Sequence, residues 1–71
     1  MTVIAVLHRV GEDKVETCGI YSASNTDAYD AAAVFAALRT EGTIVLEEHV
    51  VHARKGRPSM RELKRIDCYG K

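Results

Sequence analysis

One helical segment between strand-like runs most constrains what this chain can fold into. The run 22–26 supplies residues able to cap a helix, and Asp27 and Asp30 suit the positive end of the helix dipole. Gly42 is a natural stop for a helix over 27–39. Spacings of three and four give this helix one apolar stripe. The stripe consists of Ala28, Ala31, Ala32, Phe35 and Leu38.

Three runs rich in β-branched residues surround the helix. Thr2 to Val10 and Val15 to Tyr21 flank the polar turn Gly11-Glu12-Asp13-Lys14, which predicts a hairpin, and Thr43 to Ala53 is a third strand. The order β-β-α-β predicts an α+β domain, a small antiparallel sheet with one helix packed on one face. The expected core is Ile4, Val6, Val15, Ile20, Val34, Phe35, Leu38, Ile44, Leu46 and Val50.

Residues 54–71 form a basic C-terminal element with two interpretations. Gly56 and Pro58 interrupt the strand pattern. Ser59-Met60-Arg61-Glu62 matches a capping box, which favours a short helix that carries Met60, Leu63 and Ile66 inward. The alternative is a fourth strand that folds back on the third. With 71 residues, the chain is expected to be a single domain over 1–71.

Charge is distributed unevenly along a chain whose net charge is zero. Residues 1–51 carry three basic and eight acidic side chains, whereas residues 52–71 carry seven basic and two acidic ones. Such asymmetry predicts a partner-binding surface at one end. The expected partner-binding residues are Arg54, Lys55, Arg57, Arg61, Lys64 and Arg65. The alternative is an acidic face formed by Asp27, Asp30 and Glu48.

The sequence contains no motif typical of catalysis or of cofactor binding, so we expect neither an enzyme nor a cofactor. Cys18 and Cys68 form no CxxC pair and are expected to be reduced, buried, small apolar residues rather than a disulfide. His49 and His52 point to opposite faces of a strand, which argues against a metal site. His8 is expected to be a hydrogen-bonded core or edge histidine.

No apolar run approaches the roughly 18 residues that a membrane-spanning helix needs, and the first residues lack the basic start of a signal peptide. A cytoplasmic location and no membrane partner are therefore expected.

A resemblance of layout adds a functional hypothesis. The order strand, turn, strand, Ile20-Tyr21-Ser22-Ala23, capping run, Asp27-Ala28-Tyr29-Asp30-Ala31-Ala32 and valine-rich strand resembles small phage proteins that disable host machinery. These are T7-type inhibitors of bacterial RNA polymerase and compact anti-CRISPR proteins. The resemblance covers about residues 2–54 and carries over no functional residue. It implies a phage or mobile-element protein that blocks a host nucleic-acid machine by stoichiometric protein contact in the host cytoplasm.

Two other functions stay open. Lys55-Gly56-Arg57-Pro58 is similar to the core of an AT-hook, which would make the chain an accessory protein that binds DNA or RNA. A structural or assembly subunit is the third hypothesis. A homodimer is also expected, because the first or third strand of an open sheet would lack a protected edge.

Overall fold

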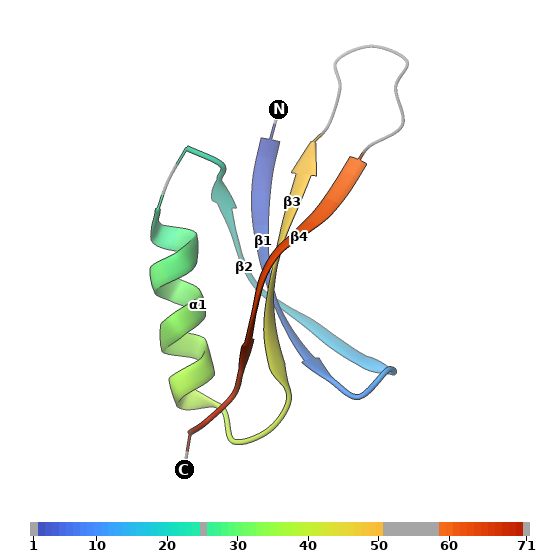
Figure 1. The fold of residues 1–71 in the computed structure, drawn as a ribbon, viewed down its shortest axis with the longest axis vertical. Helices are drawn as coiled ribbons and strands as arrows, with labels where there is room; N and C mark the ends of the chain where they lie inside the picture. Colours follow the sequence, from blue (N-terminus) through green and yellow to red (C-terminus); the bar gives the residue numbers. More distant parts are fainter. Residues whose placement is uncertain (1, 25, 51–58, 71) are drawn as a thin grey trace.

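The computed structural model describes residues 2–24, 26–50 and 59–70. The elements follow one another as β1 (Thr2–Val10), β2 (Lys14–Ser22), α1 (Asp27–Leu38), β3 (Thr43–Val50) and β4 (Ser59–Asp67). Four antiparallel strands form one twisted sheet, and α1 lies across one of its faces (Figure 1). The predicted α+β class, the hairpin and the helix packed on one face of the sheet are confirmed. Residues 51–53, expected in the third strand, lie outside the described residues.

The strand order is β2-β1-β3-β4, so the first and third strands are the two central ones. Helix α1 carries the chain back over the sheet, and β3 then pairs with β1 from Thr2↔Val50 to Arg9↔Thr43. The expectation that the first or third strand offers an edge is therefore wrong. The edges belong to β2 and β4.

The C-terminal element is a strand, so the expected short helix is wrong and the alternative is confirmed. The pairs Leu46↔Lys64 and Glu47↔Glu62 leave Leu63 as an extra residue of β4, which is a β-bulge. The bulge allows both Leu63 and Ile66 to pack against the core, although they are three positions apart. Residues three positions apart lie on the same side of a helix, so the spacing of Leu63 and Ile66 predicts a helix. In this strand the bulge produces the same spacing on one face.

The other edge strand is bulged in the same way. The pairs Val6↔Gly19 and Leu7↔Thr17 leave Cys18 as the extra residue of β2, and Cys18 packs against the core. Bulges twist an edge and interrupt its row of free backbone groups, which hinders pairing with another strand. Both described edges of this sheet thus carry a feature that protects them.

The core lies between the sheet and the alanine face of α1. Ile4, Val6, Ile44 and Leu46 are buried as expected. On the helix, the residues that face the sheet are Ala28, Ala32 and Ala36. Phe35 and Val50 are half-buried. Four expected core residues are exposed instead: Val15, Ile20, Val34 and Leu38.

These four errors have two causes. The helix turns its smallest residues inward because they allow the closest approach to the sheet, so Val34 and Leu38 face outward. Val15 and Ile20 pair with Arg9 and Ala5, on the sheet face opposite α1. Apolar spacing within a segment does not reveal which of two faces a neighbouring layer covers.

The segment after β4 closes the C-terminal end of α1. The Tyr69 amide donates to the carbonyl of Ala36 at 3.0 Å, and the Gly70 amide donates to the carbonyl of Arg39 at 2.7 Å. These bonds satisfy carbonyls that a helix end leaves without intrahelical donors. A Cβ at Gly70 would lie 2.6 Å from both the Ala37 and Arg39 carbonyl oxygens, so this approach requires glycine.

Candidate functional site

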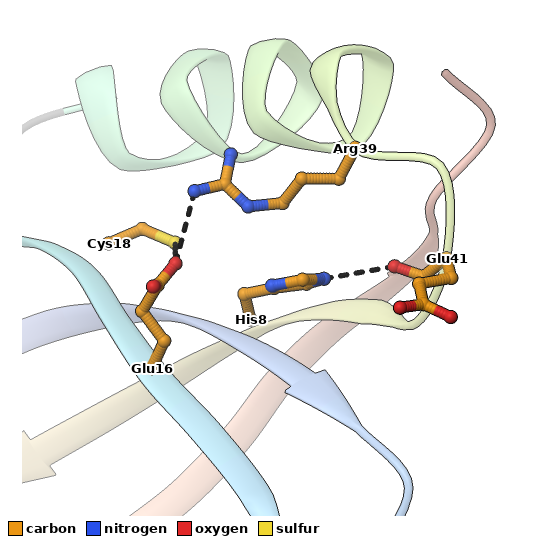
Figure 2. Close-up of polar contacts among 5 residues, drawn as sticks. All are labelled: His8, Glu16, Cys18, Arg39 and Glu41. Carbon is orange, nitrogen blue, oxygen red and sulfur yellow. Dashed lines mark hydrogen bonds and ion pairs between the residues drawn. The ribbon is translucent and has the colours of Figure 1, made fainter. Parts of the chain in front are cut away.

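A polar cluster lies between the C-terminal end of α1 and the sheet (Figure 2). Arg39 Nη2 donates to Glu16 Oε1 at 3.2 Å, and the guanidinium carbon lies 5.1 Å from the centre of the Phe35 ring. The Cys18 thiol lies 3.9 Å from the same carboxylate oxygen. These contacts attach the end of the helix to β2.

Burial raises the pKa of the Cys18 thiol, and this outweighs the opposing effect of the Arg39 cation. Burial also raises the pKa of the Cys68 thiol. Thiols with raised pKa values hold few thiolates at neutral pH, and the thiolate is the reactive form. Both cysteines are free and partly buried, and both pack against the core as the sequence predicts.

His8 extends from β1 into the same cluster and donates from Nε2 to the backbone carbonyl of Glu41 at 2.9 Å. This confirms a histidine satisfied by a hydrogen bond. A shallow hollow of about 360 Å³ adjoins it along the β1–β2 hairpin. Its lining residues are His8, Val10, Asp13, Lys14, Val15 and Glu16. Over 2–24, 26–50 and 59–70, no three His, Cys, Asp or Glu side chains are grouped to hold a metal ion.

The structure divides the predicted basic surface. Arg54, Lys55 and Arg57 lie outside the described residues. Arg61 and Lys64 pair with Glu48 and Leu46 on the helix side of the sheet, whereas Arg65 pairs with Val45 on the other side. Arg61 contacts Glu48 at 3.1 Å, and Arg65 contacts Glu62 at 2.7 Å. All three β4 cations are exposed, and two of them bind carboxylates of this chain. Whether the basic set binds a partner stays a prediction.

The alternative acidic residues lie on two elements. Asp27 and Asp30 occupy the first turn of α1, as predicted, although the Thr26 side chain makes no capping bond there. Glu48 belongs to β3 and is half-buried beside Arg61. The structure thus gives the two aspartates a place at the helix dipole and gives Glu48 an ion-pair partner.

The sheet has a second face, which no described element covers. Strand residues alternate between faces, and the two bulges shift that alternation in β2 and β4. We call this surface the open face. It comprises Val3, Ala5, Leu7 and Arg9 of β1; Val15, Thr17, Ile20 and Ser22 of β2; Thr43, Val45, Glu47 and His49 of β3; and Met60, Glu62, Arg65 and Asp67 of β4.

Large apolar side chains are exposed on the open face. Val15 is 51% exposed, Ile20 is 65% exposed and Met60 is 56% exposed. Charged side chains alternate with them: Glu47 contacts His49 at 3.2 Å, and Glu62 contacts Arg65. The exposed apolar residues lie on the two edge strands, and the central residues Ala5 and Val45 are only 8% and 2% exposed. Exposed apolar side chains among polar residues and charges of both signs are a composition found in protein-binding surfaces. Sequence reasoning missed this surface because it assigned Val15 and Ile20 to the core.

No family model matches the chain, and no curated protein or solved structure is significantly similar to it. In the described residues, no helix is long and apolar enough to cross a bilayer. Function is therefore inferred from the surfaces that the fold presents.

Proposed function

We propose that this chain is a binding protein that docks on another protein through the open face of its sheet and acts without catalysis. The observation that carries the proposal is the exposure of Val15, Ile20 and Met60 on a face that no described element covers. Burying exposed apolar area on a partner gains roughly 25 cal/mol per Å² before the costs of association.

The mixture of side chains on the open face favours a protein partner. Glu47, Glu62 and Arg65 lie among the apolar residues, and both signs of charge are present. A duplex-binding surface would be predominantly basic, because affinity for nucleic acid depends on neutralising phosphates. The open face is not predominantly basic.

The narrower proposal concerns the partner. We propose a phage or mobile-element inhibitor that binds a host nucleic-acid machine, either an RNA polymerase or a CRISPR-type defence complex, in the host cytoplasm. The layout that resembles phage inhibitors supports this role. A stoichiometric inhibitor needs a docking surface and no reactive group, which fits the protonated state that burial favours for both thiols.

Transcription by a bacterial RNA polymerase, measured against increasing amounts of the chain, tests the narrower role. The expected result is inhibition that is complete near one chain per polymerase. Ile20→Asp should abolish it, because the aspartate would place a charge inside the docked apolar patch. Val34→Asp is the matched control, since Val34 is a similarly exposed apolar residue on the other side of the molecule; it should inhibit like the parent. Target cleavage by a CRISPR effector is measured in the same way.

Two results would count against these proposals. If the parent inhibits neither machine, the narrower role is wrong. If alanine at Arg57, Arg61 and Lys64 together abolishes inhibition whereas Ile20→Asp does not, the basic segment rather than the open face is the site, because this variant keeps Arg65, the basic β4 residue of the open face. Steeply salt-dependent binding of the chain alone to duplex DNA would then identify a nucleic-acid-binding protein.

A further inference from the structure

We draw no further inference here: the strongest candidate, the exposed apolar patch of Val34 and Leu38 on the side of α1 that faces away from the sheet, adjoins the exposed Asp30, and nothing in the structure shows what covers it.

Discussion

Glu62 and Arg65 form an ion pair at 2.7 Å on one face of β4, although residues three apart in a regular strand face opposite sides. The extra residue Leu63 makes the pair possible, because the bulge shifts the alternation by one position. It turns Leu63 toward the core and moves Arg65 to the open face. One inserted residue thus determines which β4 side chains the open face presents.

Leu46→Ala and Leu38→Ala should lower the free energy of unfolding by very different amounts. Leu46 is fully buried between the sheet and α1, so Leu46→Ala should lower the free energy of unfolding by about 2–5 kcal/mol. Leu38→Ala should change it by less than about 0.5 kcal/mol, because Leu38 is exposed. Urea unfolding at a concentration where the chain is monomeric measures both. Equal losses would mean that Leu38 contributes to the core.

Replacing Gly11 or Gly42 with alanine distinguishes two causes of lost stability, backbone strain at positive φ and steric overlap of the new Cβ. Both have positive φ, 65° at Gly11 and 86° at Gly42, so alanine at either should cost about 1–2 kcal/mol. At Gly42 a Cβ would also lie 2.4 Å from the Arg9 carbonyl oxygen, whereas at Gly11 it meets nothing within 4 Å. Gly42→Ala should therefore be the more destabilising in thermal unfolding. The reverse order would contradict the close approach of the α1–β3 turn to β1.

The Cys18 thiol should make the folded state less stable as the pH becomes alkaline. Because burial raises its pKa in the folded state, the protonated thiol is favoured by folding. This stabilisation is complete below the ordinary thiol pKa of about 8.5 and is lost as pH rises through the higher folded value. Cys18→Ser should therefore show a smaller fall in urea midpoint between neutral pH and about pH 9.5 than the parent does. An unchanged pH profile would show that the thiol is equally solvated in both states.

Removing the β2 bulge should expose a regular sheet edge. Deletion of Cys18 would make the ladder continuous, since Thr17 and Gly19 already pair with the consecutive residues Leu7 and Val6. The expected product folds with a loss of roughly 1–2 kcal/mol and forms higher oligomers, because its free backbone groups lie in one row. Cys18→Ala, which keeps the bulge, is the control. Light scattering distinguishes the two, and a monodisperse deletion variant would argue against protection by the bulge.

Local signals determined the elements that the sequence predicts well. The first strand is where the sequence places it because Gly11 to Asp13 interrupts a run rich in Val, Ile and Leu, and α1 begins at Asp27 as the capping residues indicate. The segment 59–67 was mispredicted because the bulge gives Leu63 and Ile66 a helical spacing within a strand. No residue type marks the position of that bulge.

The open face could not be predicted from the sequence of any one strand, because its exposure depends on how the strands and the helix are arranged. Ile20 and Leu46 are both apolar residues in strands, and only the strand order and the position of α1 decide that one is exposed and the other buried. Charge, in contrast, was easy to locate in the sequence. The register of β4 with β3 determines that Arg61 and Lys64 lie on the helix side of the sheet and Arg65 on the open face.

The strand order also has a consequence for the kinetics of folding. Each outer pair, β1 with β2 and β3 with β4, joins neighbouring segments, whereas the central β1–β3 ladder joins Arg9 to Thr43 and Thr2 to Val50. Closing that long loop costs chain entropy before the central contacts form, so the docking of two separate hairpins should limit the rate. A hairpin that docks on the wrong copy would satisfy the same ladder, and domain-swapped dimers are therefore the expected product of refolding at high concentration.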